Sequence, residues 1–291
     1  MNLLHQGEDF YGLPVVTVSN GDLELDVLET AGPRIIRFRS RLAGEKNILA
    51  ETPDQRISTP HGDYRVLGGH RLQTAPETLP STYIPDNRPV QIHETAKGVN
   101  IASQVEPETG LSRAISVQFT EEQVPVTITH QIKNHGAQPL QLSAWSLTML
   151  PPGGRIIMPL RFSNDKSQKV LPDRSLVFWP YSRLEAGNFS FSEKTAELNS
   201  SNDHTPFKFG GMAEWLAYEF DHLVFVKTIF VQNALPYPDR GCSVEAYANG
   251  NFVELESLSP LVLLEPGQYI EHIEKWQLIT RHAFSTWFPG D

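Results

Sequence analysis

The sequence has very little cysteine, no long hydrophobic run and no cluster of basic residues. Cys242 is the only cysteine among the 291 residues, so no disulfide can form within the chain, and no Cys/His cluster suggests structural zinc. No stretch approaches the roughly 18 consecutive apolar residues that indicate a membrane-spanning helix. These absences argue against a disulfide-stabilised secreted domain and against a membrane protein.

The balance of charge excludes a further class of partner. Lysine and arginine together number 24, aspartate and glutamate 34, and the net charge is −10. Because cationic contacts supply most of the affinity for a phosphodiester backbone, an acidic chain without a basic run does not indicate nucleic-acid binding. The first residues, MNLLHQGEDFYG, lack a basic segment followed by an apolar one, so we expect no signal peptide and a cytoplasmic location.

Motifs for cofactors and metals are absent as well. No GxGxxG or Walker motif occurs, no pair of histidines has the spacing of a zinc site, and no EF-hand loop is present. No Ser/His/Asp order indicates a catalytic triad. We therefore expect neither a cofactor nor a metal, and no pattern indicates an oligomeric state.

What the sequence does contain is a rhythm of short apolar runs separated by turns, with 20 glycines and 22 prolines spread along the chain. Apolar and polar residues alternate along 23–29, and Asn20-Gly21 before this run is a strong two-residue hairpin signal. About a dozen runs predict strands. The clearest are 15–18, 23–29, 34–40, 115–119, 126–132, 140–147, 223–231, 251–258 and 269–279.

These runs predict an all-β fold, a large twisted sandwich with helix below about 10% of residues, because no long helical period accompanies them. The stretch 161–222 has no regular period, and the sequence leaves open either a long excursion with short strands or a lid over a site. No composition shift, linker or repeat divides the chain, so we expect a single domain over residues 1–291.

Three segments are more specific than a structural role requires, and together they carry a resemblance. They are LGGHRLQTAPE at 67–77, WSLTMLPPGG at 145–154 and FVELESLSPLV at 252–262. With the opening strand pair around Asn20-Gly21 and the closing Glu274-Lys275-Trp276, their order and spacing resemble the galactose mutarotase-like (aldose 1-epimerase-like) superfamily, and one bacterial branch in particular. The resemblance implies a galactose-mutarotase-like β-supersandwich whose concave face binds a small-molecule sugar.

The first segment offers three polar side chains. Two glycines before His70 let the backbone approach a ligand closely and aim the imidazole into a cleft. His70 would protonate or hydrogen-bond a ring oxygen, Arg71 would hold a pair of hydroxyls or an acidic group, and Glu77 would accept from sugar hydroxyls. The residues alone also allow a glycine bulge with a purely structural His70. The resemblance favours the catalytic role, because mutarotase-like proteins have a histidine in this glycine-rich segment.

Glu254 and Glu256 form the second set. Two residues apart on a strand, they share one face, while Val253 and Leu255 point the other way into the core. Burial can raise the pKa of a carboxyl until it serves as a base near neutrality. The resemblance matches Leu255-Glu256 to the glutamate that takes the anomeric hydroxyl proton in mutarotases, so Glu256 is the expected base and Glu254 a substrate-binding residue. The alternative is a solvated outer face.

The sequence departs from the mutarotase pattern along 140–147. Mutarotases have a second histidine there, the general acid on the ring oxygen, whereas this chain has Ala144-Trp145. Trp145 is expected to stack on the apolar face of a sugar, but an indole cannot donate and recover a proton as an imidazole does. His130 is the substitute that the sequence offers, although its apolar neighbours fit a buried structural histidine equally well.

Lys227 interrupts the apolar run 223–231, where a lysine is costly unless it pairs with a carboxylate or a ligand. A pair with Glu254 or Glu256 would place it at the sugar, and a structural ion pair is the alternative. Glu274 lies on the apolar face of its own predicted strand and has the same two interpretations.

The leading hypothesis is therefore an aldose 1-epimerase-like isomerase that transfers protons at the anomeric carbon of a sugar without a cofactor, with Glu256 as base and His70 as acid. The alternative is a non-catalytic carbohydrate-binding protein using the same cleft, which the missing second histidine favours. An accessory module of a polysaccharide-processing enzyme is less favoured, since we expect neither a signal peptide nor a catalytic domain beside it. The acidic charge favours neutral or weakly anionic sugars over polyanions.

Overall fold

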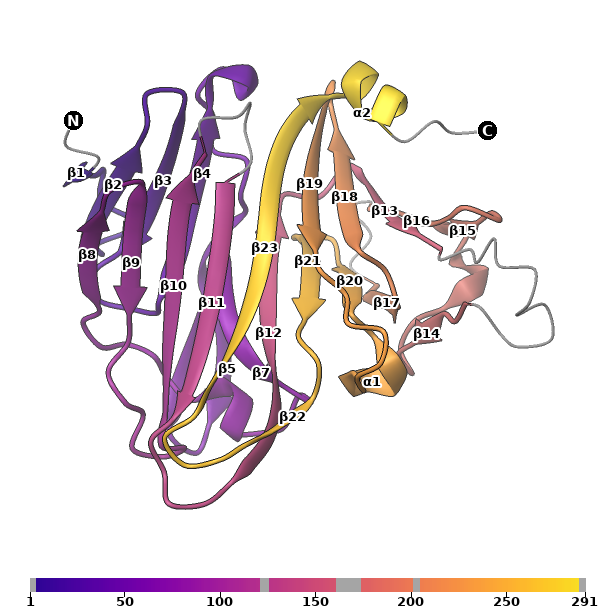
Figure 1. The fold of residues 1–291 in the computed structure, drawn as a ribbon. Coiled ribbons are helices and arrows are strands. Elements are labelled where there is room, and N and C mark those ends of the chain that lie inside the picture. The colour runs from indigo at the N-terminus through magenta and orange to yellow at the C-terminus, as the bar shows by residue number, and fades with distance from the viewer. Residues whose placement is uncertain (1–3, 121–125, 161–173, 201–204, 288–291) are drawn as a thin grey trace.

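Two large antiparallel sheets face each other and make up most of the molecule (Figure 1). The structure, a computed structural model, describes residues 4–120, 126–160, 174–200 and 205–287. It is 55% strand and only 8% helical, which confirms the predicted all-β class and the low helix content. In the view of Figure 1 the 10-stranded sheet lies in front of the 11-stranded one.

The 11-stranded sheet combines strands from the beginning, middle and end of the chain. In spatial order its strands are β1 (Leu4–Gln6), β2 (Val15–Ser19), β3 (Leu23–Leu28), β4 (Arg34–Ser40), β7 (His70–Ala75), β12 (Leu140–Leu150), β21 (Val253–Leu258), β20 (Val244–Ala248), β17 (Phe207–Gly211) and β14 (Val177–Phe178), with β22 (Val262–Leu264) paired to β12. The centre of this sheet therefore brings together strands nearly 190 residues apart in sequence, from β7 to β21.

The 10-stranded sheet is built in the same antiparallel way. Its strands in spatial order are β15 (Phe189–Phe191), β16 (Thr195–Asn199), β13 (Arg155–Pro159), β18 (Trp215–Phe220), β19 (Leu223–Ile229), β23 (Tyr269–Thr280), β11 (Val126–Asn134), β10 (Leu111–Phe119), β9 (Gly98–Ala102) and β8 (Gln91–Thr95). A separate hairpin joins β5 (Glu51–Thr59) to β6 (Gly62–Gly68). The two α-helices among the described residues are the short α1 (Pro238–Gly241) and α2 (Arg281–Trp287).

Local sequence signals account for many of these strands. β2 and β3 pair antiparallel around the predicted Asn20-Gly21 turn, where the Asn20 side chain accepts hydrogen bonds from the backbone N–H groups of Asp22 and Leu23. Burial alternates strictly along β11 and along most of β23, as a period of two requires of strands with one face in a core. The nine clearest runs all form strands, with ends shifted by a few residues.

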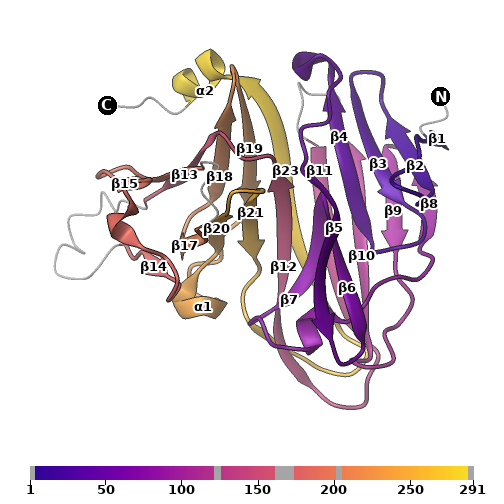
Figure 2. The ribbon, with the colours of Figure 1, turned by 180° about the vertical axis from the view of Figure 1, so that it is seen from behind.

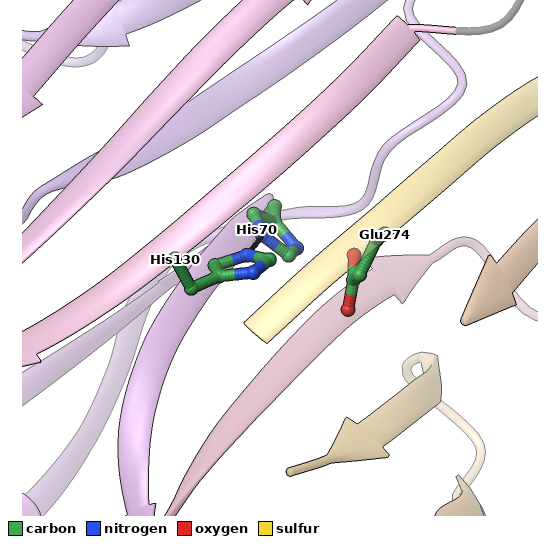
Figure 3. A group of neighbouring side chains, drawn as sticks. All are labelled: His70, His130 and Glu274. Carbon is green, nitrogen blue, oxygen red and sulfur yellow. Dashed lines mark hydrogen bonds between the residues drawn. The ribbon is translucent and has the colours of Figure 1, made fainter. Parts of the chain in front are cut away.

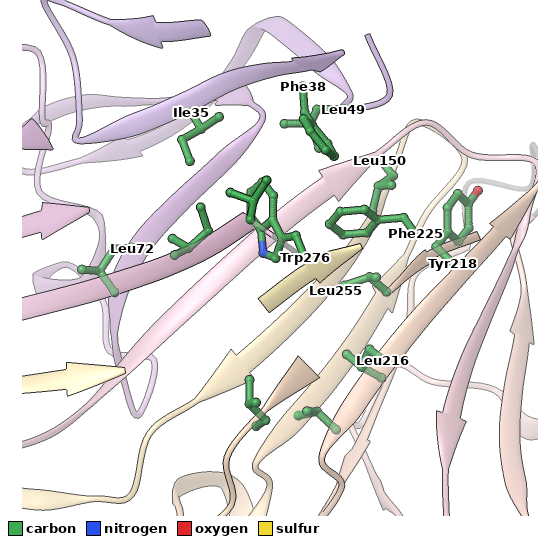
Figure 4. Close-up of a cluster of buried hydrophobic side chains, with 14 of the residues drawn as sticks. Ile35, Phe38, Leu49, Leu72, Leu150, Leu216, Tyr218, Phe225, Leu255 and Trp276 are labelled. Carbon is green, nitrogen blue, oxygen red and sulfur yellow. The ribbon is translucent and has the colours of Figure 1, made fainter. Parts of the chain in front are cut away.

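The hydrophobic core fills the space between the two sheets (Figure 4). Trp276 from β23 lies at its centre, with ring centroids 5.5 Å from Phe225 and 6.0 Å from Phe38, which belong to β19 and β4. Val253 and Leu255 of β21 also enter this core, as the sequence predicts. Each such side chain contributes about 1.5–3 kcal/mol by leaving water, so the shared core holds the sheets together.

The other face of the 11-stranded sheet, which we call the outer face, points away from the core and is partly covered. The β5–β6 hairpin crosses it beside β7 and β12 (Figure 2). Tyr64 of the hairpin, Tyr83 from the 3-10 turn η2 (Ser81–Tyr83) and Met149 of β12 form a separate apolar cluster there. The hairpin therefore borders the part of the outer face toward which the central strands direct their buried polar side chains.

The stretch that lacks a regular period contains short strands wherever the structure describes it. β14, β15, β16, β17 and β18 all lie between 174 and 220, so the described part of this stretch contains short strands, as the first alternative predicts. A role as a lid over a site stays a prediction. Residues 161–173 and 201–204 of the same stretch lie outside the described residues. In the part of the chain that the structure describes, no helix is long and apolar enough to cross a membrane.

Candidate functional site

The centre of the outer face carries a group of charged and aromatic side chains that local alternation alone does not bring together. Strand register places Leu147 of β12 between Arg71 and Glu256, and it places Glu245 of β20 directly opposite Glu256 of β21. Lys208 extends from β17, the next strand across. Since alternate residues of a strand share a face, these side chains all project to the outer side of the sheet.

Glu256 is held on one carboxylate oxygen and has no partner on the other. Its Oε2 accepts hydrogen bonds from the indole N–H of Trp145 at 2.7 Å and from Lys208 Nζ at 2.8 Å. Its Oε1 is buried without a hydrogen-bond partner among the residues that the structure describes, and the residue is only 1% exposed. A buried carboxylate oxygen without a partner has lost its hydration, so Oε1 is an unsatisfied hydrogen-bond acceptor.

Glu245 repeats this arrangement from the neighbouring strand. Its Oε2 lies 2.7 Å from Lys208 Nζ, and its Oε1 is likewise buried without a partner. Burial raises the pKa of Glu245 well above its usual value, and the nearby charge of Glu256 raises it further, against the opposing effect of Lys208. Burial and Glu256 therefore favour the protonated form of Glu245, and Lys208 favours the ionised form.

Lys208 joins the two glutamates. Burial alone would lower its pKa, but the charges of Glu256 and Glu245 outweigh burial and hold the pKa well above the usual lysine value. The ammonium group also lies 4.9 Å from the ring centroid of Trp145 and 4.6 Å from that of Trp179, both cation–π distances. Lys208 is therefore a fixed positive charge in an aromatic setting.

Arg71 and Glu254 form a second ion pair beside this group. Arg71 Nη2 donates to Glu254 Oε1 at 2.8 Å, while Nη1 contacts the sulfur of Met149 at 3.0 Å and Nε has no partner. Burial raises the pKa of Glu254, although Arg71 opposes the shift. The pair thus has donor capacity left over on the arginine, as a ligand with several hydroxyls requires.

The border of this area is aromatic. On the hairpin side, Tyr64 accepts a 2.7 Å hydrogen bond from Gln73, and the Tyr83 hydroxyl donates to the exposed Glu77 at 2.6 Å. On the opposite side Tyr181 is 41% exposed, and its ring packs edge-to-face on Tyr247 with centroids 6.5 Å apart. Aromatic faces beside carboxylates offer a sugar ring both apolar contact and hydrogen-bond acceptors.

His70 and His130 lie on the other side of the sheet, in the core between the two layers (Figure 3). Their Nε2 atoms are 2.7 Å apart, His70 Nδ1 contacts the Thr148 hydroxyl at 2.9 Å, and His130 Nδ1 lies 3.0 Å from the backbone oxygen of His272. Since a carbonyl can only accept, His130 donates from Nδ1, its Nε2 accepts from His70, and Thr148 donates to His70. Burial lowers the pKa of both imidazoles, and all four ring nitrogens have hydrogen-bond partners in this arrangement.

Lys227 also belongs to the interior and not to the outer face. Its ammonium group lies 2.9 Å from Glu274 Oε1 and 2.9 Å from the backbone oxygen of Leu255. The expected pairing with Glu254 or Glu256 is therefore replaced by the structural ion pair, because β19 turns Lys227 toward the facing sheet. Ser146, Ser257 and Trp276 all donate to the same carboxylate of Glu274.

The interior group contains the one set of possible metal ligands found in the described part of the chain. Ligand atoms of His70, His130 and Glu274 lie within 4.8 Å of one another (Figure 3). Both histidines and the glutamate already have hydrogen-bond partners, and the Lys227 ammonium occupies the place beside Glu274 that a cation would take. The donor set fits a closed hydrogen-bond network better than a metal centre.

No family model matches the chain, and no curated protein matches its sequence. Solved structures do match. A galactose mutarotase-like protein from Clostridium acetobutylicum has a TM-score of 0.58 at 11% identity, covering 95% of this chain and 98% of that one. A galactose mutarotase-like protein from Lactobacillus casei ATCC 334 has a TM-score of 0.56 at 8% identity, covering 91% and 100%. This chain has the galactose mutarotase-like fold.

The same fold occurs within a larger protein. A TPR-domain containing protein from Parabacteroides distasonis ATCC 8503 matches with a TM-score of 0.61 at 12% identity over 91% of this chain. The match covers 47% of that protein, so this chain spans about half of its length. The outer-face residues all lie on the larger sheet of this galactose mutarotase-like fold. Their strands are β7, β12, β17, β20 and β21.

The structure thus divides the residues singled out from the sequence into two groups. Arg71, Trp145, Glu254 and Glu256 meet on the outer face, and Glu77 lies at its border through Tyr83. His70, His130 and Lys227 are not brought to that face, because they point into the core.

Sequence reasoning missed Lys208 and Glu245 altogether, together with the border residues Trp179, Tyr181 and Tyr247. A signal existed in FKF at 207–209 and VEA at 244–246, where one charged residue lies between two apolar ones on a buried strand.

Proposed function

We propose that this chain is a carbohydrate-active protein that binds an uncharged sugar on the outer face and transfers protons at its anomeric carbon, as an aldose 1-epimerase does. Glu256 is the proposed base. The observation that carries the proposal is its Oε1 atom, a buried acceptor without a partner on a carboxylate whose other oxygen is fixed by Trp145 and Lys208.

Two further observations support a sugar as the ligand. Arg71, Glu254 and Glu256 place donors and acceptors within one small area, and the border provides the aromatic rings of Trp179, Tyr181 and Tyr247. This combination suits a molecule with hydroxyls around its edge and C–H groups on its faces. A candidate aldose 1-epimerase from Escherichia coli K12 shares the fold, with a TM-score of 0.55 at 13% identity over 92% of this chain and 100% of that one.

The proposed reaction needs a base and an acid. Glu256 Oε1 removes the proton from the anomeric hydroxyl, the bond between the anomeric carbon and the ring oxygen breaks, and the ring oxygen takes up a proton. Rotation of the open-chain aldehyde about the bond next to its carbonyl carbon, followed by ring closure through the reverse steps, gives the other anomer. Arg71 and Glu254 would hold hydroxyls of the sugar, and Trp145 holds Glu256 in position.

NMR exchange spectroscopy between α and β anomers over a panel of neutral sugars tests this directly. Glu256→Gln keeps size and one acceptor but cannot take a proton, so the exchange rate should fall by about 10²–10⁴-fold while sugar affinity changes far less. Glu254→Gln is the matched comparison on the same strand face, and it should weaken binding mainly. Equal losses of exchange in both variants, or none in Glu256→Gln, would contradict the role of Glu256.

Non-catalytic sugar binding is the second candidate, and one specific observation favours it. Three histidines are buried among the described residues, His70, His130 and His272, and all three lie in the interior, so none of them supplies an imidazole beside Glu256. Saturable binding of a sugar without any acceleration of anomer exchange would establish this function in place of the epimerase.

A further inference from the structure

We propose that Glu245 carries a proton at neutral pH and donates it to the ring oxygen of the bound sugar, as the acid partner of the base Glu256. This inference rests on the proposed function and assigns to it the acid that the buried, described histidines do not supply. Glu245 comes from β20, next to Glu256 on β21, and both carboxyl groups contact the same nitrogen, Lys208 Nζ.

The balance of charge in this buried group calls for one added proton. Lys208, Glu245 and Glu256 are all more than nine-tenths buried, and with both glutamates ionised they would hold one uncompensated negative charge. An isolated charge in the protein interior is strongly disfavoured, whereas one proton on either glutamate makes the group neutral.

Among the charged groups that act most strongly on Glu245, Lys208 is the one cation. The positive charge of Arg71 is already paired with Glu254 on the neighbouring part of the face. On the other side of Glu245, Asp239 adds negative character, and the Cys242 thiol is kept protonated because burial raises its pKa. Glu256 and Asp239 thus favour the neutral form of Glu245, and Lys208 opposes them.

The hydrogen bonds indicate which glutamate holds the proton. Glu256 Oε2 accepts from two donors, Trp145 and Lys208, so its negative charge is the better stabilised. Glu245 has Lys208 alone, on Oε2. Its Oε1 is buried and lacks a partner among the described residues, so this oxygen is the one that can carry the proton.

Gly210 of β17 provides the room for this side chain. A Cβ atom at Gly210 would lie 3.0 Å from Cγ of Glu245 and 2.9 Å from the sulfur of Cys242. Because Gly210 pairs with Glu245 across the strands, a larger residue would push the carboxyl group away from Lys208. The site is thus shaped around Glu245 as well as around Glu256.

The step balances in protons and electrons. Glu256 Oε1 takes the proton of the anomeric hydroxyl, whose oxygen forms a double bond to carbon as the carbon–ring oxygen bond breaks. The electron pair of that bond goes to the ring oxygen, which receives the proton of Glu245. The group then holds the same number of protons as before, now on Glu256, and ring closure returns them. Lys208 is a positioning residue that keeps its own proton throughout.

Glu245→Gln tests the inference, because glutamine has the size, neutrality and hydrogen-bonding groups of a protonated glutamate but no proton to give. The anomer exchange rate should fall by about 10²–10⁴-fold, with sugar affinity and the urea midpoint of unfolding nearly unchanged. A fall in the urea midpoint with a retained exchange rate would instead show an ionised, structural Glu245 and overturn the inference.

Infrared difference spectroscopy reads the proton without any activity. The wild-type protein should show the carbonyl stretch of a protonated carboxyl at neutral pH, absent in Glu245→Gln and retained in Glu197→Gln, a matched change in a glutamate of the other sheet. The same band should weaken as pH rises, together with the alkaline limb of the exchange rate. A wild-type spectrum without this band would overturn the inference.

The experiments also separate this inference from the proposed function. Loss of exchange in Glu256→Gln but not in Glu245→Gln leaves the epimerase in place and removes Glu245 as its acid. Sugar binding without exchange in the wild-type protein removes the epimerase itself, and with it the proton transfer from Glu245.

Discussion

The indole nitrogen of Trp145 lies 2.7 Å from Oε2 of Glu256, on adjacent strands of the larger sheet. Trp145 occupies the strand position at which the resemblance to mutarotases implies a histidine. An indole donates a hydrogen bond but cannot exchange its proton near neutral pH, so Trp145 supports the carboxylate instead of acting on the ring oxygen. In the proposed reaction Trp145 therefore positions Glu256 and does not itself transfer a proton.

Trp145→Phe should therefore impair Glu256 without unfolding the protein. The ring volume largely remains, while a hydrogen bond to a charged group, worth about 1.5–3 kcal/mol, is lost. We expect anomer exchange or, in the binding case, sugar affinity to fall by about 10–100-fold, measured by NMR exchange and by calorimetric titration. Unchanged values of both would show that Lys208 alone holds Glu256.

The ion pair between Lys227 and Glu274 should be essential for stability. Both residues are almost completely inaccessible, and removing one partner of a buried pair leaves an uncompensated charge. Lys227→Met should lower the free energy of unfolding by about 3–5 kcal/mol in urea titrations. Lys275→Met, a change at an exposed position of β23 nearby, should shift it by less than about 0.5 kcal/mol. A similar small shift for both would mean that Glu274 readily takes up a proton.

The sequence predicts which residues of one strand share a face, but it does not predict which strands pair with one another. The period of two placed Glu254 and Glu256 on one face and Val253 and Leu255 on the other, because that relation holds within a single strand. His70 and Arg71 are adjacent, so one of them had to point inward. Which one does so is decided by the pairing of β7 with β4 and β12, which no local pattern states.

Lys208 and Glu245 show the same limit more sharply. Each is one charged residue in a short apolar strand, and neither has a partner near it in sequence. Their contact with Glu256 exists because β17, β20 and β21 are neighbours in the sheet. The sequence therefore predicts the pair Glu254 and Glu256, which lie on one strand. It does not predict Lys208 and Glu245, which reach Glu256 only through the order of the strands in the sheet. The single domain over 1–291 and the cytoplasmic location stay predictions.

Gly69 should tolerate alanine poorly, for a reason different from the ligand contact that the sequence suggests. A Cβ atom there would lie 2.3 Å from the backbone oxygen of Ile35, so the glycine allows two strands to approach. Gly44 is a matched control, since its φ of 64° is close to the 68° of Gly69 while no atom lies within 4 Å of a Cβ there.

Gly44→Ala should therefore lower the free energy of unfolding by about 1–2 kcal/mol through backbone strain alone. Gly69→Ala carries the same strain and an added clash of about 1–3 kcal/mol. Urea titration of both variants isolates the clash as the difference between them. Equal losses would show that the backbone at Gly69 shifts freely.

The stability of the protein should depend on pH through its buried histidines, and His272 provides the clearest measurement. Burial lowers the pKa of His272 to about 3, and burial likewise lowers the pKa values of His70 and His130. In the unfolded chain a histidine has a pKa of about 6.5, so between about pH 6.5 and 3 the unfolded state binds more protons than the folded state. The free energy of unfolding therefore gains a contribution above pH 6.5 that is lost as pH falls, by about 1.4 kcal/mol per pH unit for each such histidine. Glu245 and Glu254 have raised pKa values, so above about pH 4.5 their contribution to the free energy of unfolding falls as pH rises. The pH dependence of the total free energy of unfolding therefore does not isolate the histidines.

The comparison of wild type with His272→Gln isolates the contribution of one imidazole. Glutamine can still donate to Ser257, which His272 Nε2 contacts at 2.6 Å, but it does not titrate. Urea titrations at pH 7, 6 and 5 should give a smaller loss of stability in the variant, with the difference in slope approaching about 1.4 kcal/mol per pH unit below pH 6. Identical slopes in the two proteins would mean that His272 takes up its proton while the sheets remain packed, in which case the interior network is open to water and His70 and His130 would have to be reconsidered as titrating groups.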